Sequence, residues 1–229
     1  MKILELAPYL FIEDHPHGSR NKSGLAYMVR SICDMVSKEN EVHVLTQSII
    51  TKEQKVGDWI LLRRNLFTVF KSIKFRYVAV ALQMIRLEGL SKLPRVFLYA
   101  LSAGQVERHI TKWRPDIVHI HSITPYTLPY LYAATICKVP VVITLHALFS
   151  FNEIVPVPTT QRELERAFLR VCVKKGYSLS VISSGMKRKI QSATLSSCNN
   201  ISVITNCFRP IIIPQFDKKE TDEYRIICV

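Results

Sequence analysis

The chain has 229 residues, 48% of them hydrophobic, which is enough for one large or two small folded domains and excludes a disordered chain. Its formal net charge of +13 predicts an acidic partner, such as a phosphate-bearing ligand, an anionic membrane or nucleic acid. The six cysteines form no Cys-x-x-Cys pair, so a zinc knuckle and a disulfide framework are disfavoured and a reducing cytoplasm is expected.

The N-terminal part of the chain has the order strand, helix, strand. Residues 2–7 predict a strand, which meets an acidic residue too early to be a signal peptide. After a loop with two prolines, Ser23 is a suitable N-cap for a helix whose apolar residues recur at helical spacing as far as Val36. Residues 41–46 predict the second strand, and this order requires a right-handed crossover and a parallel sheet.

Residues 52–95 are rich in basic side chains and poor in acidic ones. Their apolar residues recur at a helical period, so the segment predicts a basic amphipathic helix. The apolar stripe comprises Leu66, Phe70, Ile73, Tyr77, Val80, Met84 and Leu87. Two interpretations stay open: a solvated helix over the core, or a membrane-facing surface with Lys71, Lys74 and Arg76 near anionic lipid. Aromatic residues do not alternate with the charges, which disfavours nucleic-acid binding.

Two hydrophobic segments that each end in a histidine are the most informative part of the sequence. Residues 115–121, Pro-Asp-Ile-Val-His-Ile-His, and residues 139–146, Val-Pro-Val-Val-Ile-Thr-Leu-His, are typical of buried parallel strands. In an open α/β sheet, ligands bind at the carboxyl ends of the strands. His121 and His146 are therefore ligand candidates, whereas His119 is expected in the core.

Predicted helices and strands alternate through the rest of the chain. A helix is expected over residues 95–113, and Pro125 can begin another between the two histidine-tipped strands. A later helix ends at Gly176, and Ser183 or Ser184 can cap the next one. Strands are expected over residues 177–182 and 201–205. The pattern predicts an α/β fold with a doubly wound, mostly parallel, Rossmann-like sheet.

Several catalytic motifs are absent from the sequence. Residues 18–24 lack the glycine that a P-loop places before Lys-Ser, and there is neither Gly-x-Ser-x-Gly nor Gly-x-Gly-x-x-Gly. ATP binding, hydrolysis by a serine nucleophile and hydride transfer are therefore disfavoured. His119 and His121 lie on one face of a strand, but no third and fourth zinc ligand can be placed, so no metal is expected. Ser23 and Gly24 form either an ordinary helix cap or an anion site at a helix N-terminus.

Motifs in this order resemble the N-terminal domain of family 4 glycosyltransferases, which have the GT-B fold. Ser23-Gly24 takes the place of the family's Gly-Gly, and residues 40–46 resemble its segment ending in Gly-His-Glu-Val. Residues 115–121 are similar to Pro-Asp-Val-Val-His-x-His, and residues 140–146 to Pro-Val-Val-x-Thr-x-His. Residues 203–209 resemble the interdomain signature Val-Ile-Pro-Asn-Gly-Val-Asp.

The resemblance implies a Rossmann-like half that binds the sugar acceptor and faces a second half that binds a nucleotide-sugar. Gly24, with Ser23, would bring backbone N–H groups to the donor pyrophosphate. His146 would lie beside the donor sugar as the catalytic residue, and His121 and Ser122 would line the cleft. Such enzymes retain the anomeric configuration and need neither a metal nor another cofactor, because helix dipoles and basic side chains stabilise the leaving group.

The resemblance also implies a biological setting and a domain organisation. The expected function is hexosyl transfer in bacterial surface polysaccharide or glycolipid assembly, in the cytoplasm or at the inner face of the cell membrane. The expected partners are a nucleotide-sugar donor, a glycan or lipid-linked acceptor and an anionic membrane surface, and no nucleic acid. Residues 1–208 would be the acceptor-side domain, 209–223 a linker and 224–229 the start of a donor-binding domain, without which the chain would be inactive unless a separate C-terminal half supplied it.

Two other functions stay open on the sequence. One is a non-catalytic peripheral membrane module that binds a lipid-linked or phosphorylated glycan. The other is one half of a GT-B-like sugar-nucleotide epimerase, which would act without an acceptor.

Overall fold

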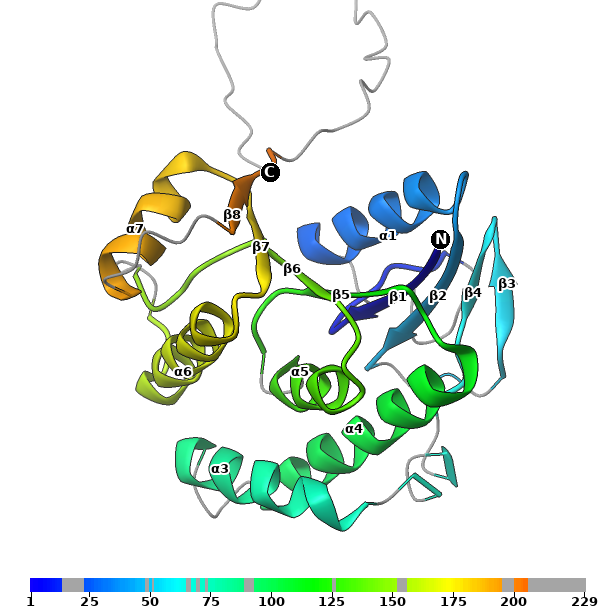
Figure 1. Ribbon diagram of the computed structural model, residues 1–229, viewed down its shortest axis with the longest axis horizontal. Coiled ribbons are helices and arrows are strands. Elements are labelled where there is room, and N and C mark those ends of the chain that lie inside the picture. The colour runs from blue at the N-terminus through cyan, green and yellow to red at the C-terminus, as the bar shows by residue number, and fades with distance from the viewer. Residues whose placement is uncertain are drawn as a thin grey trace, which may run out of the picture.

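Figure 1 gives the computed structural model of the chain. The structure describes residues 1–13, 23–47, 50, 52–64, 67–68, 71–72, 74–88, 93–124, 127–151, 156–194 and 200–205. The strands of this part of the chain are β1 (Lys2–Ala7), β2 (Glu41–Thr46), β3 (Gln54–Val56), β4 (Trp59–Leu61), β5 (Ile117–His121), β6 (Val141–Leu145), β7 (Ser178–Val181) and β8 (Ile201–Val203). The helices are α1 (Gly24–Val36), the 3-10 helix η2 (Phe75–Tyr77), α3 (Val78–Glu88), α4 (Leu93–Trp113), α5 (Thr127–Ile136), α6 (Thr159–Lys175) and α7 (Ser184–Thr194).

The strands form one sheet in the order β3-β4-β2-β1-β5-β6-β7-β8. β1 lies in its centre, with Ile3 opposite Val42 of β2 on one side and Ile117 of β5 on the other. Of the described strands, β3 alone runs antiparallel to its neighbour. A parallel sheet interleaved with helices is the doubly wound α/β architecture, so the predicted fold class is confirmed.

Helices cover both faces of the sheet. In Figure 1, α1 lies on one side of the sheet, and α4 and α5 lie on the other. Side chains of a strand alternate between the faces, so each central strand supplies two hydrophobic cores. Ile3 of β1 belongs to a core with Val29 of α1, whereas its neighbour Leu4 belongs to a larger core with Val106 of α4 and Leu128 of α5.

The predicted helix ends agree with the structure. Ser23 begins α1, and its Oγ accepts a hydrogen bond from the backbone N–H of Ala26 at 3.2 Å. Gly176 ends α6 with a φ of 67°, in the left-handed region that glycine adopts easily. Ser183 is the residue that caps α7, since its Oγ accepts from Met186 N–H at 3.2 Å. Capping residues alone therefore located these boundaries.

The prediction of one basic amphipathic helix over residues 52–95 is wrong. Its first part forms the β3–β4 hairpin at the edge of the sheet, with a turn at Gly57 and Asp58 in which Gly57 has a φ of 58°. Trp59 anchors the hairpin, because its ring is fully buried and its Nε1–H donates to Asp34 at 2.8 Å. The pair Gly57-Asp58 between the apolar residues Val56 and Trp59 is typical of a hairpin turn. The helical periodicity of the surrounding residues led to the wrong prediction.

Among the described residues, the helices within this segment are η2 and α3, which begin at Phe75 and Val78; residues 67–68 are also helical, and α4 begins at Leu93. Tyr77 and Val80 of the predicted apolar stripe are buried there. The stripe residues Leu66, Phe70 and Ile73 lie outside the described residues.

Within the described part of the chain, no helix combines the length and the apolar character needed to cross a membrane. The sheet and its helices occupy the first 205 residues, inside the predicted domain of residues 1–208. The predicted linker, 209–223, and the predicted start of a further domain, 224–229, lie outside the described residues.

Candidate functional site

The candidate site lies at the centre of the sheet, at the carboxyl ends of the parallel strands. Within the sheet, β2 is the neighbour of β1 on one edge. The chain later returns to place β5 next to the opposite edge of β1. Between β1 and β5 the direction of the strand order therefore reverses, and ligands of doubly wound folds bind at such a switch point. Glu5 of β1 lies directly opposite His119 of β5 at this point.

Glu5 holds two imidazole rings with one carboxylate oxygen. Its Oε2 accepts hydrogen bonds from His119 Nδ1 and from His121 Nε2, each at 2.8 Å. Glu5 and His121 are both fully buried, while His119 is partly exposed and its Nε2 lies 2.8 Å from Thr144 Oγ of β6. The adjacent strands thus position a buried acid and two bases in one hydrogen-bonded cluster.

A fourth polar group, His146, extends the cluster beyond the end of β6. His146 Nε2 lies 3.3 Å from His121 Nδ1, and the two rings are nearly parallel, with centroids 5.6 Å apart. The other ring nitrogen of His146, Nδ1, is buried and has no hydrogen-bond partner among the described residues. Buried polar atoms are usually hydrogen-bonded, so this nitrogen at the end of the series Glu5–His121–His146 stands out as a group able to bind a ligand.

The charges of this cluster follow from burial and from the contacts. Burial alone would raise the pKa of Glu5, but the charge of His119 and the hydrogen bonds from His119 and His121 hold that pKa well below its usual range. Burial lowers the pKa of His121, and the charge of His119 adds to this effect. Burial and the nearby histidines lower the pKa of His146 to about 4. At neutral pH, Glu5 is therefore an anion and His121 and His146 are neutral.

These charge states fix the direction of each hydrogen bond. An ionised carboxylate only accepts, so His121 Nε2 carries the hydrogen. Neutral His121 then has an unprotonated Nδ1, which accepts from His146 Nε2–H. Neutral His146 is left with an unprotonated Nδ1, and that nitrogen is an acceptor for an incoming O–H or N–H group.

The structure reverses the predicted exposure of the two histidines on β5. His121 was expected to line the cleft, but it is fully buried, and His119 is the more exposed of the pair. The reason is Glu5, whose carboxylate draws both rings toward β1 on the face that α1 covers. Sequence reasoning missed Glu5, although an acidic residue inside the apolar run of residues 2–7 is an unusual feature of a buried strand.

Ser122 lies at the end of β5, next to His121, with a backbone conformation that serine rarely adopts. Its φ is 61°, and its N–H donates to Thr144 O at 2.8 Å. Residues in this left-handed region concentrate at functional sites. The prediction that Ser122 lines the cleft remains a prediction, and its half-buried position at the strand end is compatible with it.

Ser23 and Gly24 form the exposed N-terminus of α1. Ser23 caps the helix by accepting from Ala26 N–H with its Oγ and from Tyr27 N–H with its carbonyl oxygen. A Cβ atom on Gly24 would have no atom within 4 Å, so the space in front of this residue is open. The structure is therefore an ordinary cap that also presents helix N–H groups to an open surface.

Glu165 of α6 holds the loop after β6, on which His146 lies. Its two carboxylate oxygens accept from the backbone N–H groups of Phe149 at 3.0 Å and Ser150 at 2.6 Å. Glu165 is almost completely buried. Sequence reasoning missed this residue because nothing local links it to a loop 15 residues away.

The ligand-type atoms of Glu5, His119 and His121 lie within 4.8 Å of one another, which is close enough to surround a metal ion. The third metal ligand that the sequence did not supply is therefore available in space. In the observed arrangement, however, the imidazole N–H groups occupy the carboxylate oxygen themselves. These charge-assisted hydrogen bonds engage Oε2 of Glu5, whereas its buried Oε1 has no hydrogen-bond partner among the described residues.

The three residues predicted to face a membrane differ in their contacts. Lys74 Nζ and Arg76 Nη2 form ion pairs with the buried carboxylate of Glu107 in α4, at 2.5 and 2.7 Å. Burial alone would raise the pKa of Glu107, but the hydrogen bonds from Lys74 and Tyr77 and the charges of Lys74 and Arg76 lower it. Lys71 instead stacks on the Phe67 ring at 4.2 Å. Lys74 and Arg76 thus attach η2 to α4.

The chain matches Glycosyltransferase Family 4 over residues 23–210, so it belongs to this family, and the resemblance seen in the sequence is confirmed. A comparison with curated protein sequences finds no match.

Three solved structures are similar to this chain at low sequence identity. Sucrose-phosphate synthase from Thermosynechococcus elongatus is 11% identical, with 90% of this chain and 48% of that chain covered and a TM-score of 0.56. A UDP-N-acetylglucosamine 2-epimerase is 12% identical, with 90% and 48% covered and a TM-score of 0.50. A glycosyltransferase from Rickettsia africae ESF-5 is 14% identical, with 89% and 42% covered and a TM-score of 0.47. The chain spans less than half of the length of each of these proteins.

Proposed function

We propose that this chain is the acceptor-side domain of a nucleotide-sugar-dependent, retaining glycosyltransferase of hexosyl type that works with a donor-binding second domain. Membership of Glycosyltransferase Family 4 supports the class of reaction. The observation that carries the assignment of the site is the buried Nδ1 of His146 at the end of the strands, which has no hydrogen-bond partner within the described part of the chain. A sugar hydroxyl is the kind of donor that this nitrogen lacks.

In the proposed enzyme, His146 binds and orients a hydroxyl group of the donor sugar. Its Nε2–H is engaged by His121, which Glu5 in turn fixes in one tautomer. The ring therefore cannot rotate without breaking its bond to His121, and its acceptor nitrogen keeps one direction. His121 is a positioning residue in this proposal, because it is buried behind His146.

The N-terminus of α1 is proposed to receive the donor pyrophosphate. Its dipole and the N–H groups that follow Ser23 favour an anion, and the open space at Gly24 lets a phosphate approach the backbone. Negative charge that develops on the departing nucleoside diphosphate would be stabilised there. Neither a metal nor another cofactor is needed for this role, so we expect transfer to continue in the presence of EDTA.

The test of the site compares two histidine substitutions in the complete enzyme. His146→Ala should lower kcat/KM for sugar transfer by about 10²- to 10³-fold, the usual effect of losing one positioned hydrogen-bonding group. His43→Gln is the matched control, because His43 belongs to a second histidine pair, with His109, on the other face of the sheet. Near-normal transfer by His146→Ala would remove His146 from the site. The same assay without acceptor detects the alternative epimerase reaction as a change in the donor sugar alone.

We further propose that the enzyme is a cytoplasmic protein that binds the inner face of the membrane and acts on a lipid-linked or glycan acceptor of surface polysaccharide or glycolipid assembly. Support comes from the exposed apolar residues of η2 and α3: Phe75 is 91% exposed, Leu82 55% and Val78 42%. Exposed Arg86 and Lys71 lie on the same segment. Apolar side chains beside cations suit the interface of an anionic bilayer.

Flotation with phosphatidylglycerol vesicles tests this second proposal. Phe75→Ser with Leu82→Ser should release the protein from the vesicles, because the exposed apolar anchor is lost. Unchanged flotation of this variant would contradict the role of η2 and α3, while leaving the proposed transfer site untouched.

A further inference from the structure

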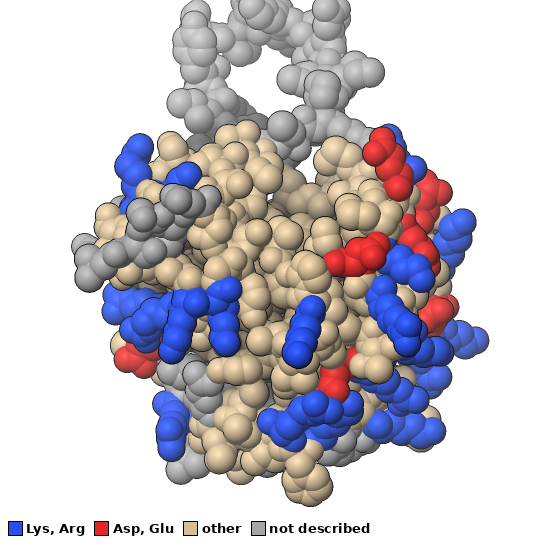
Figure 2. Space-filling model, viewed as in Figure 1, with Lys and Arg blue, Asp and Glu red and all other residues tan. Residues whose placement is uncertain are grey.

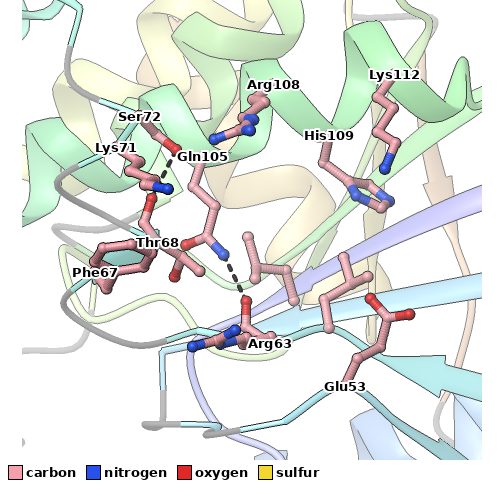
Figure 3. A pocket seen from close by; sticks show the side chains of 12 residues that line it. Glu53, Arg63, Phe67, Thr68, Lys71, Ser72, Gln105, Arg108, His109 and Lys112 are labelled. Carbon is pink, nitrogen blue, oxygen red and sulfur yellow. Dashed lines mark hydrogen bonds between the residues drawn. The ribbon is translucent and has the colours of Figure 1, made fainter.

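A groove lies on the face of the sheet opposite the Glu5 cluster, between α4 and residues 62–63, 67–68 and 71–72. It consists of two adjoining cavities of about 320 and 530 Å³, which share Lys71, Ser72, Arg108 and Lys112 in their walls. In Figure 3, Arg108 and Lys112 extend into it from α4, Lys71 reaches in from the opposite wall, and Arg63 lies below them. We call this cavity pair the basic groove.

Cations dominate the walls of the basic groove. Arg63, Lys71, Arg108 and Lys112 line the first cavity, and Glu53 is the one acidic residue among its described lining residues. By contrast, Lys74, at the rim of the second cavity, is engaged by Glu107. The groove therefore carries positive charge that the described neighbours do not neutralise. Figure 2 shows Lys and Arg side chains gathered over the lower and right-hand part of this view, where α3, α4 and β3 lie.

Two of these cations are placed where they repel each other. Arg108 and Lys112 are one turn apart on α4, and like charges at this spacing destabilise a helix. Lys112 also helps to lower the pKa of His109 in the groove wall to about 4, after burial and the charge of His43. This repulsion lowers the stability of the free protein, and a bound anion between the two cations would relieve it. Such a loss of stability is typical of functional sites.

The walls of the groove are fixed relative to each other. A Cβ atom on Gly104 of α4 would lie 1.8 Å from Ser72 O, so glycine lets the backbone of the segment rest directly on the helix. At the next residue of α4, Gln105 Nε2 donates to Arg63 O at 2.7 Å. These contacts hold Arg63, Lys71 and Arg108 around one space before any ligand arrives.

We propose that the basic groove binds a phosphomonoester or pyrophosphate group, as a second anion site of this protein. Lysine ammonium and arginine guanidinium groups converging on one cavity are the usual donors for phosphate oxygens. The cavities are large enough for a phosphate with one attached sugar or glycerol unit. This site goes beyond the proposed transfer reaction and does not depend on it, because it lies on the other face of the sheet. The phosphate belongs either to a soluble ligand or to a lipid headgroup.

Calorimetric titration with inorganic pyrophosphate at low salt tests the proposal on this chain. Arg108→Gln with Lys112→Gln should weaken binding about 10- to 100-fold, because two charge-assisted hydrogen bonds are lost. The control variant, Lys174→Gln with Lys175→Gln, removes the same charge from exposed positions at the end of α6 and should change Kd by less than about twofold, as expected for screened surface charges. Lys71→Gln, an exposed single substitution on the other wall, should weaken binding in the same direction.

Thermal unfolding supplies a readout that does not depend on binding. Without ligand, Arg108→Gln with Lys112→Gln should unfold at the same or a higher temperature than the unsubstituted protein, since repulsion within α4 is removed. The rise in Tm that pyrophosphate causes should shrink in this variant to what the α1 N-terminus alone contributes, and persist in full in the Lys174→Gln, Lys175→Gln control. Absence of pyrophosphate binding by the unsubstituted chain, or equal weakening in both double variants, would overturn the proposal.

Vesicles of phosphatidylcholine with phosphatidic acid distinguish the two sources of the phosphate. If Arg108→Gln with Lys112→Gln loses both flotation and pyrophosphate binding, the groove takes a lipid headgroup. If it loses pyrophosphate binding and still floats, the groove takes a soluble phosphate. Loss of flotation with intact pyrophosphate binding would mean diffuse surface attraction and would also overturn the proposal.

Discussion

Among single residues, Glu5 decides which nitrogen atoms of the histidine cluster are already engaged in hydrogen bonds. Burying a carboxylate is costly unless charged or polar groups compensate it, and here His119 and His121 both donate to the same oxygen. Once His121 is committed to Glu5, the next free imidazole nitrogen along the chain of rings is that of His146. Both histidine-tipped strands could be predicted from the sequence, and the role expected for His146 stays a prediction. The partner of His121 could not be predicted from local sequence, because it is 116 residues away.

Glu165→Gln is the residue-scale test of how the loop after β6 is held. The amide side chain replaces one of the two oxygens that accept from Phe149 and Ser150, so one buried N–H group loses its acceptor. We expect the free energy of unfolding to fall by about 1–3 kcal/mol, and hydrogen exchange at Ser150 N–H to become faster than at β6. Glu163→Gln, two residues away on the exposed side of α6, should change neither measurement. Unchanged exchange at Ser150 would contradict the role of Glu165.

At the scale of elements, the regular parts of the fold were predictable and the region between β2 and α4 was not. β1 and β2 have the predicted bounds, because both strands are short apolar runs that end at polar or turn-forming residues. Residues 52–95 also repeat at a helical period, but burial of Trp59 against Asp34 favours a hairpin instead. Tertiary contacts of this kind override local propensity.

Gly104→Ala tests the close contact between α4 and residues 71–72. Alanine favours a helix over glycine by about 1 kcal/mol, so a neutral position would gain stability. Here the new Cβ would collide with the Ser72 carbonyl oxygen, a backbone atom that cannot rotate away. We therefore expect a net loss of about 1–3 kcal/mol in the free energy of unfolding, measured with urea. Gly24→Ala, where a Cβ meets no atom within 4 Å, is the control and should stay within about 0.5 kcal/mol. A stabilised Gly104→Ala protein would show that the contact is loose.

For the whole molecule, the sheet separates two polar systems. The Glu5 cluster lies on the side that α1 covers, and the His43–His109 pair lies on the side that α4 covers. The parallel sheet and its strand ends could be predicted from periodicity, and the cleft was expected at those strand ends. The basic groove could not, because its cations come from α4 and from a segment more than thirty residues earlier, and only packing brings them together.

On acidification, the protein should begin to lose stability at pH values higher than those at which carboxylates become protonated. The pKa values of His109 and His146 in the folded chain are about 4, below the unfolded value of 6.5. Between these values the unfolded chain binds more protons than the folded chain, so stability that is complete above about pH 6.5 decreases toward about pH 4. Glu5, whose pKa is also lowered, adds a further loss only as the pH falls below the unfolded value of 4.5.

Urea midpoints at about pH 7 and about pH 5 measure this effect. The midpoint should be lower at the acidic pH, and the difference should shrink in the His109→Gln, His146→Gln variant. An equal midpoint at both pH values would mean that these two rings titrate in the folded protein as they do in the unfolded chain.

One stacked pair of aromatic rings can report, through intrinsic fluorescence, on changes at the face of the sheet that α4 covers. The indole of Trp113 stacks on the His43 ring, with centroids 3.8 Å apart and planes 8° from parallel, and His43 in turn contacts His109. The only other tryptophan of the chain, Trp59, is fully buried against Asp34. A change in the protonation of His43, or a shift of α4 along β2, therefore alters the emission of Trp113 and leaves that of Trp59 constant. Trp113 is therefore an intrinsic fluorescence probe of this face of the sheet, and Trp59 is its internal reference.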